Sequence, residues 1–85
     1  MVRIVYFYFM KNLPQRITEL APGHAAYWRA QELPDYAGGP FEDRSGGLIT
    51  FSAVDFEAAQ QLVSGDPFIQ TGVLEQHWVK VWNTE

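Results

Sequence analysis

Residues Val2–Met10 read VRIVYFYFM, a run of β-branched and aromatic side chains that predicts a strand at the start of the chain. Successive side chains of a strand point to opposite faces. One face therefore carries Val2, Ile4, Tyr6 and Tyr8, and the other carries Val5, Phe7 and Phe9. Because both faces are apolar, we expect this strand to be covered on both sides.

Prolines divide the segment that follows. Pro14 and Pro22 are expected to interrupt any helical turn near residues 15–20. Pro22 suits the first turn of a helix, where its missing N–H costs nothing, and good helix formers follow it. Pro34 ends this helix, because a residue that precedes proline avoids the helical region.

The middle of the chain predicts a hairpin. Residues 35–41 (DYAGGPF) form a short extended piece whose Gly-Gly-Pro belongs at a sheet edge or a bend. Residues 42–47 (EDRSGG) are a turn cluster. Residues 47–53 (GLITFSA) predict the next strand, at a separation that suits pairing with residues 35–41.

The last part of the chain predicts one more helix and one more strand. Ser52-x-x-Asp55 resembles a capping box, and apolar residues at helical spacing follow it up to Gly65 and Pro67. Residues 66–72 (DPFIQTG) predict a tight loop or a single helical turn. Residues 74–82 predict the last strand, with Trp78 and Trp82 on one face, buried beneath a helix or against a second copy of the chain.

These elements follow the order β-α-β-β-α-β over a single domain, residues 1–85. The order predicts an α+β, ferredoxin-like fold, in which a four-stranded antiparallel sheet carries both helices on one face. The other face of the first strand is still apolar and would leave a large exposed patch. We therefore expect a homodimer with the sheet faces in contact.

Composition narrows the class of partner. Six basic residues stand against ten acidic ones, a net charge of −4, which argues against a nucleic-acid partner. The longest apolar run, Ile4 to Met10, is far short of the roughly 20 residues of a membrane helix. Lys11 ends that run without a following cleavage site, so we expect no signal peptide, no membrane partner and a cytoplasmic protein. There is no cysteine, and His24 and His77 lack ligand spacing, so no metal is expected.

Two residues are candidates for proton chemistry. In the first turn of the predicted helix, His24 would meet a helix dipole that favours neutral imidazole, a potential general base. A capping or merely exposed histidine is the structural alternative. Asp66, between Gly65 and Pro67, is either a turn former or a carboxylate that orients and charges a histidine. His77 is expected to be packed or interfacial, and Gly38-Gly39-Pro40 to be a bulged edge strand rather than a phosphate loop.

Several of these residues occur together in an ordered set. His24-x-x-Tyr27, Gly39-Pro40 and Asp66-Pro67-Phe68 with Gly72, followed by an aromatic-ended strand, resemble the YciI-like (YCII-related) family over nearly the whole chain. The resemblance implies a ferredoxin-like fold, dimeric α/β-barrel packing and a pocket centred on His24 and Asp66. It also implies that Tyr27, Gly39 and Pro40 bind substrate. The loop at residues 34–38 departs from the family pattern.

The combined expectation is a small dimeric protein in which His24 moves a proton on a small, ring-shaped substrate without a cofactor. Asp66 would hold the imidazole, and Tyr6 or Tyr8 would line the pocket and donate a hydrogen bond. The reaction would be of the lyase, isomerase or dehydrohalogenase type, and one branch of the family resembles a dehydrochlorinase of chlorinated hydroquinones. The alternatives are a non-catalytic metabolite-binding or accessory domain, or a monooxygenase of the barrel superfamily.

Overall fold

The computed structural model describes all 85 residues of the chain. The elements are, in order, β1 (Val2–Met10), α1 (Pro14–Ala30), β2 (Ala37–Pro40), β3 (Gly46–Ala53), α2 (Phe56–Ser64), α3 (Pro67–Gln70) and β4 (Leu74–Val81). Apart from the single turn of α3, this is the predicted β-α-β-β-α-β order.

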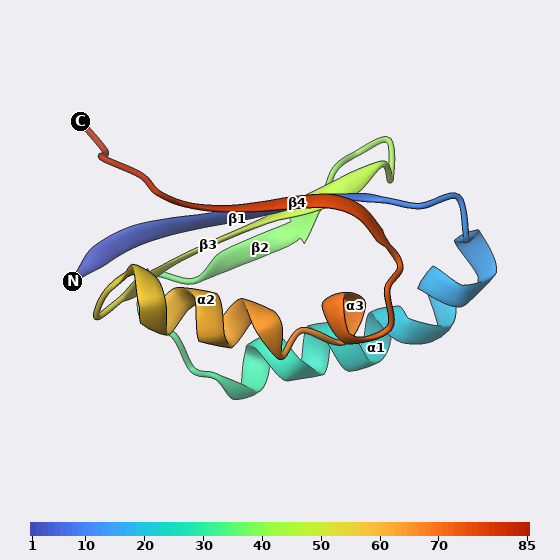
Figure 1. Cartoon of the computed structure of the whole chain (residues 1–85), viewed down its shortest axis with the longest axis horizontal. Helices are drawn as coiled ribbons and strands as arrows, with labels where there is room; N and C mark the ends of the chain where they lie inside the picture. Colours follow the sequence, from blue (N-terminus) through green and yellow to red (C-terminus); the bar gives the residue numbers. More distant parts are fainter.

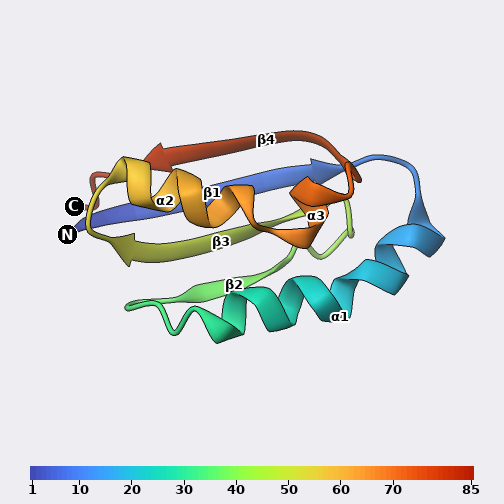
Figure 2. The same ribbon diagram turned by 60° about the horizontal axis from the view of Figure 1, so that its bottom comes forward.

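The four strands form one antiparallel sheet in the order β2-β3-β1-β4. The central strand β1 pairs with β3 on one side and with β4 on the other, so Tyr6 lies between Ile49 and Val79. All three helices lie on one face of the sheet (Figures 1 and 2). The predicted α+β, ferredoxin-like fold is therefore confirmed.

The core fills the layer between the sheet and the helices. Its buried side chains come from every layer: Ile4, Tyr6, Tyr8, Ile49, Phe51 and Ala53 of the sheet, Trp28 of α1, Ala59 and Val63 of α2, Phe68 of α3, and Val73. The β1 residues among them, Ile4, Tyr6 and Tyr8, belong to the face predicted as Val2, Ile4, Tyr6 and Tyr8. The alternation of β1 thus decides which of its aromatic rings reach the helices.

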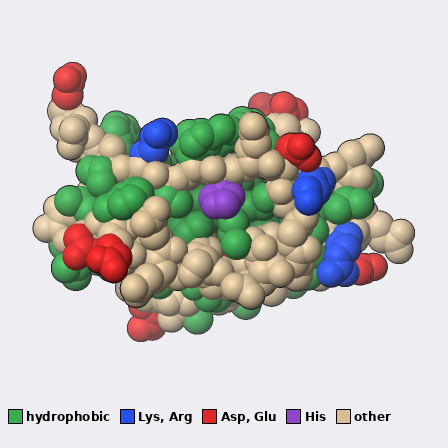
Figure 3. Space-filling model, in the orientation of Figure 1, with side chains coloured by type: hydrophobic (Ala, Val, Ile, Leu, Met, Phe, Trp, Pro, Cys, Tyr) green, Lys and Arg blue, Asp and Glu red, His purple; other side chains and the backbone are tan.

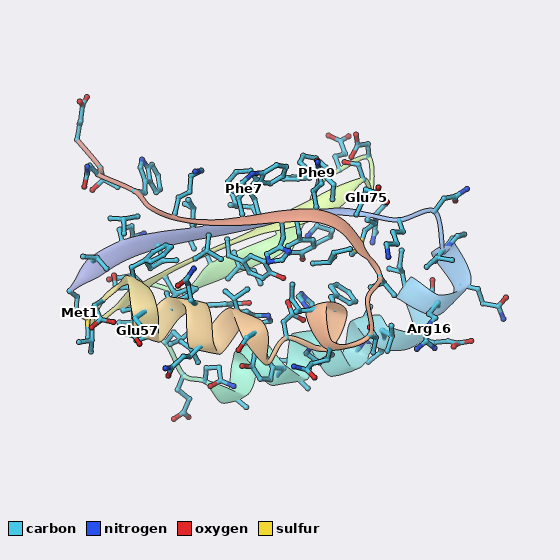
Figure 4. All side chains as sticks on the ribbon, viewed as in Figure 1. Met1, Phe7, Phe9, Arg16, Glu57 and Glu75 are labelled. Carbon is cyan, nitrogen blue, oxygen red and sulfur yellow. The ribbon has the colours of Figure 1, made fainter.

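The opposite face of the sheet carries no helix. Phe7 and Phe9 project from it, away from the helices (Figure 4), and hydrophobic side chains gather along this side of the molecule (Figure 3). The Phe7 ring stacks on that of Trp78 with centroids 5.1 Å apart. We call Phe7, Phe9, Leu48 and Trp78 the open face. Trp82 follows β4 and is 48% exposed, and Trp78 stacks on Phe7 on the face without helices. Neither tryptophan is therefore buried beneath a helix, and burial against a second copy stays a prediction.

The prediction for the first helix was wrong in its start. The helix begins at Pro14 and runs through Pro22, which lies inside it. The fixed φ of proline is compatible with a helix, and the cost is confined to one lost hydrogen bond and local crowding. Ile17 and Leu20 pack against the core from the segment expected to be broken. The first turns of α1 nevertheless extend beyond the sheet (Figures 1 and 2).

The start of the second helix also differs from the capping box expected at Ser52. Asp55 is the N-cap of α2, and its side chain accepts a hydrogen bond from the Ala58 N–H at 2.8 Å. Ser52 ends up inside β3, where its hydroxyl donates to Asp35. No helix in the chain has the length and apolar character needed to span a membrane.

Candidate active site

Asp66 is the most fully enclosed charged group of the protein, with a side chain that is 0% exposed. It follows Gly65 at the end of α2 and is the N-cap of the single turn α3, where Oδ1 accepts from the Phe68 N–H at 2.9 Å. Oδ1 also faces Nδ1 of His24 at 2.7 Å. Oδ2 accepts from the Tyr6 hydroxyl at 2.8 Å and from the Trp28 indole N–H at 3.1 Å. Both oxygens are therefore fully used.

This environment keeps the carboxylate ionised. Burial raises the pKa of Asp66, but the hydrogen bond and charge of His24, together with the Phe68 and Trp28 N–H groups, outweigh it. The net pKa lies below the ordinary value of an aspartate. Asp66 is thus both a turn former and the partner of a histidine, the two roles that the sequence left as alternatives.

His24 reaches Asp66 from α1. His24 and Trp28 are four residues apart, so they share one face of the helix and both hydrogen-bond to the Asp66 carboxylate. The imidazole stacks on the Phe68 ring with centroids 4.0 Å apart and planes 12° apart. Its other nitrogen, Nε2, lies 3.3 Å from the Tyr8 hydroxyl. Because ionised Asp66 only accepts, Nδ1 carries the proton and Nε2 is the acceptor in the neutral ring.

The position of His24 in its helix corrects one expectation. The residue lies well inside α1 rather than in its first turn. The electric field of a helix terminus falls off within one turn, so the helix dipole does not favour the neutral imidazole here as expected. The carboxylate of Asp66 is its electrostatic partner instead. His24 is neither a helix cap nor freely exposed, since its side chain is only 13% accessible.

A cavity of about 360 Å³ adjoins the His24–Asp66 pair. Its walls come from β1, α1, the β2–β3 hairpin and α3: Tyr8, Met10, Ile17, Ala21, His24, Ala25, Tyr36, Gly38, Gly39, Pro40, Arg44, Gly46, Ile49 and Phe68. A volume of this size suits a single-ring molecule. His24 and Tyr8, whose Nε2 and hydroxyl group lie 3.3 Å apart, are both part of this wall.

The predicted site residues divide into two groups. His24, Tyr8, Gly39 and Pro40 line the cavity, and the last two belong to the predicted edge strand. Tyr6 and Tyr27 do not line it. The Tyr6 hydroxyl donates a hydrogen bond to Asp66, outside the cavity lining. The Tyr27 hydroxyl donates to the Leu62 carbonyl at 2.5 Å. Their role in the structure is support of the site, which corrects the expectation that they contact substrate.

Three wall residues with aromatic or charged side chains were not predicted as site residues: Tyr36, Arg44 and Phe68. They lie in loops or a single turn, where no periodicity marks a functional side chain. Burial, and then the charge of Asp66, raise the pKa of the Tyr8 hydroxyl, so it remains a hydrogen-bond donor. No group of three or more acidic or histidine side chains is placed to hold a metal ion.

A ferredoxin-like sheet with helices on one face, and a buried histidine–carboxylate pair beside a cavity, define a small α+β protein with a candidate active site on its helix side. Within that class, the chain belongs to the YCII-related domain family, whose model matches residues 1–83. The family expected from the motifs is therefore confirmed. No curated protein matches the sequence.

Solved structures share the fold at low sequence identity. The 5-chloro-2-hydroxyhydroquinone dehydrochlorinase TftG from Burkholderia phenoliruptrix AC1100, in complex with 2,5-dihydroxybenzoquinone, has a TM-score of 0.82 and 18% identity over 98% of this chain and 95% of its own. An antibiotic biosynthesis monooxygenase has a TM-score of 0.67 and 13% identity, over 100% and 99%. A mutant of SnoaB, a cofactor-independent oxygenase from Streptomyces nogalater, has 0.55 and 12%, over 99% and 94%.

Proposed function

We propose that this protein is a cofactor-independent enzyme of the lyase, isomerase or dehydrohalogenase type that acts on a small ring substrate. His24 is the general acid and base, and Asp66 orients its ring and stabilises the imidazolium. The observation that carries the proposal is the 2.7 Å hydrogen bond from Nδ1 of His24 to a fully buried carboxylate, at the wall of a cavity.

The chemistry follows from the two nitrogens of His24. With Nδ1 held by Asp66, the Nε2 lone pair accepts a proton from a C–H or O–H group of the substrate and returns it at the same or another atom. Return at another atom is an isomerisation. Departure of a halide with the electron pair of its carbon–halogen bond gives net loss of one hydrogen halide. The Tyr8 hydroxyl, 3.3 Å from Nε2, makes only a long hydrogen bond that a substrate can replace.

The shape of the site supports a ring substrate. Phe68, Tyr8 and Tyr36 present aromatic surfaces to the cavity, which favour contact with a flat ring. The likeness in fold to a dehydrochlorinase solved with a dihydroxybenzoquinone is compatible with this substrate class. It makes chlorinated and hydroxylated hydroquinones the first compounds to test.

The test compares two histidine variants with 5-chloro-2-hydroxyhydroquinone, with chloride release and ring-proton exchange in D2O as readouts. We expect turnover by the wild type and a loss of about 100-fold or more in His24→Gln. His77→Gln is the matched control, because His77 lies on β4 outside the cavity, and it should retain full activity. Equal rates for the wild type and His24→Gln would contradict the proposal. Binding without turnover or exchange would instead favour a metabolite-binding or accessory domain.

A monooxygenase is the second candidate, because two solved structures with this fold are named as oxygenases. It predicts consumption of O2 with a quinol substrate, which an oxygen electrode measures. A haem-handling variant of this function predicts a Soret band in the purified protein. Halide release under strict exclusion of O2 would rule this candidate out.

We also infer that two copies of the chain associate through the open face. Phe7, Phe9, Leu48 and Trp78 form an apolar surface that no helix covers (Figure 4). A second copy presents the same surface and so covers it by twofold symmetry. The helix side, with the cavity, stays outside that contact and remains available to substrate.

A further inference from the structure

Arg44 lies in the β2–β3 turn, whose backbone is held by local hydrogen bonds. Its backbone lies in the left-handed region with φ 63°, and its N–H donates to the Phe41 carbonyl at 2.9 Å. On the next residue, the Ser45 N–H and hydroxyl both donate to Oδ1 of Asp43. The Ser45 carbonyl accepts from the Met10 N–H at 2.8 Å, which ties the turn to the end of β1. The turn therefore fixes the backbone from which the exposed Arg44 side chain extends.

The guanidinium of Arg44 has no partner within the protein. The ion pairs of the chain are Arg3–Asp35 and His24–Asp66, and the Arg44 side chain makes neither an ion pair nor a hydrogen bond. The adjacent carboxylate of Asp43 is engaged by Ser45. In a chain with a net charge of −4, this cation is left without a partner at the wall of the cavity.

The cavity lining carries one cationic side chain and no acidic one. Arg44 is its only lysine or arginine, and no aspartate or glutamate lines it. The buried charge of Asp66 lies behind His24 and would repel an anion that entered without a counter-charge. Arg44 offsets that repulsion. It also lines a neighbouring open hollow of about 960 Å³ that includes Lys11 and shares Met10, Ile17 and Ala21 with the cavity, so the cation stands where the two spaces meet.

We propose that Arg44 is a specificity-determining residue that binds an anionic oxygen of the ring substrate: a phenolate, an enolate or a ring carboxylate. The planar guanidinium group can donate two parallel hydrogen bonds to oxygens on neighbouring atoms. A ring bound in this way would present its opposite edge to Nε2 of His24. This inference rests on the proposed function and narrows its substrates to acidic rings. Neutral rings of the same size would meet the same aromatic walls but leave the guanidinium unpaired.

The experiment measures binding rather than turnover, so that it can fail independently of the catalytic proposal. The probes are 2,5-dihydroxybenzoquinone, which is an enolate at neutral pH, and hydroquinone, a neutral ring, each titrated calorimetrically. The proteins are the wild type, Arg44→Gln, Arg44→Lys and the control Arg16→Gln. Arg16 lies on the first turns of α1, outside the cavity (Figure 4). Circular dichroism checks that each variant is folded.

We expect Arg44→Gln to weaken binding of the enolate about 10- to 100-fold and to leave hydroquinone binding unchanged. Arg44→Lys, which keeps the charge but not the fork, should lie between, and Arg16→Gln should match the wild type. Salt should weaken enolate binding in the wild type more than in Arg44→Gln. Equal enolate affinity in the wild type and Arg44→Gln, or a wild type that prefers hydroquinone or binds neither ring, would overturn the inference. If Arg44→Gln bound the enolate as tightly as the wild type while His24→Gln lost ring-proton exchange, the proposed function would be supported and the role of Arg44 would be rejected.

Discussion

The Tyr6 hydroxyl donates a 2.8 Å hydrogen bond to Oδ2 of Asp66, which lies 60 positions further along the chain. Tyr6 comes from the central strand, while His24 and Trp28, which bind the same carboxylate, come from α1. The Phe68 N–H adds the first turn of α3. One carboxylate thus joins the sheet, the long helix and the short helix, and the site cannot form unless all three have packed.

Replacement of this carboxylate tests its structural role. In Asp66→Asn, one oxygen becomes an NH2 group, so two buried donors lose their acceptor, at a cost of about 1–3 kcal/mol each. The pKa of Asp66 is lower in the folded than in the unfolded chain. Its stabilising contribution is therefore full above the ordinary aspartate pKa of about 3.9 and is lost as the pH falls through the folded value.

We accordingly expect Asp66→Asn to be less stable than the wild type near neutral pH and to lose less stability on acidification. Urea unfolding between about pH 7 and pH 3 measures both effects. Asp55→Asn is the control, since asparagine caps a helix about as well as aspartate. A wild type and an Asp66→Asn variant with parallel stability curves would show that folding does not lower the pKa of Asp66.

The hydrogen bonds of His24 fix its tautomer. Neutral His24 should carry its proton on Nδ1, which faces Asp66, and leave Nε2 free to accept from Tyr8. Nitrogen-15 chemical shifts of the two ring nitrogens distinguish this form from the tautomer that is commoner in water. His77, which is exposed and makes no side-chain hydrogen bond, is the reference in the same spectrum. A proton found mainly on Nε2 of neutral His24 would be incompatible with a base directed at the cavity.

Gly47 leaves room for the Tyr8 ring because it has no side chain. A Cβ at this position would lie 2.5 Å from the Tyr8 hydroxyl oxygen and 2.9 Å from the Gly39 carbonyl oxygen. Gly47→Ala should therefore displace the hydroxyl from His24 and destabilise the protein by about 1–3 kcal/mol. Gly39→Ala is the matched control in the partner strand, since nothing lies within 4 Å of its Cβ position. Thermal unfolding and the His24 spectrum should change for Gly47→Ala alone.

The open face should determine the oligomeric state. Trp78 stacks on Phe7 and meets the edge of Phe9, so a glutamate there places a charge in the middle of the apolar surface. We expect the wild type to sediment as a dimer at micromolar concentration and Trp78→Glu to sediment as a folded monomer. Val54→Glu, at a residue that is 74% exposed, is the control and should stay dimeric. A wild type that remains monomeric would contradict the proposed association.

The sequence determined the features that depend on neighbouring residues. The alternation in Val2–Met10 correctly indicated a strand with two apolar faces, and the Gly-rich segment before GLITFSA indicated the hairpin. The spacing after Asp55 located α2, and the proline after Asp66 marked a single turn. Periodicity and turn chemistry act over a few residues, so they can be deduced without any knowledge of the packing.

Only the tertiary structure decided how these pieces meet. Pro22 lies inside α1 and His24 in its interior, because packing of the helix outweighs one lost hydrogen bond. The pairing of His24 with Asp66, 42 positions apart, was expected only from the family resemblance, and the structure supplies its 2.7 Å geometry. Arg44 reaches the cavity from a turn with no periodic signal. Such relationships depend on how α1 and α3 dock on the sheet. The local pattern fixes which face of an element is buried, but not which buried polar group it will meet.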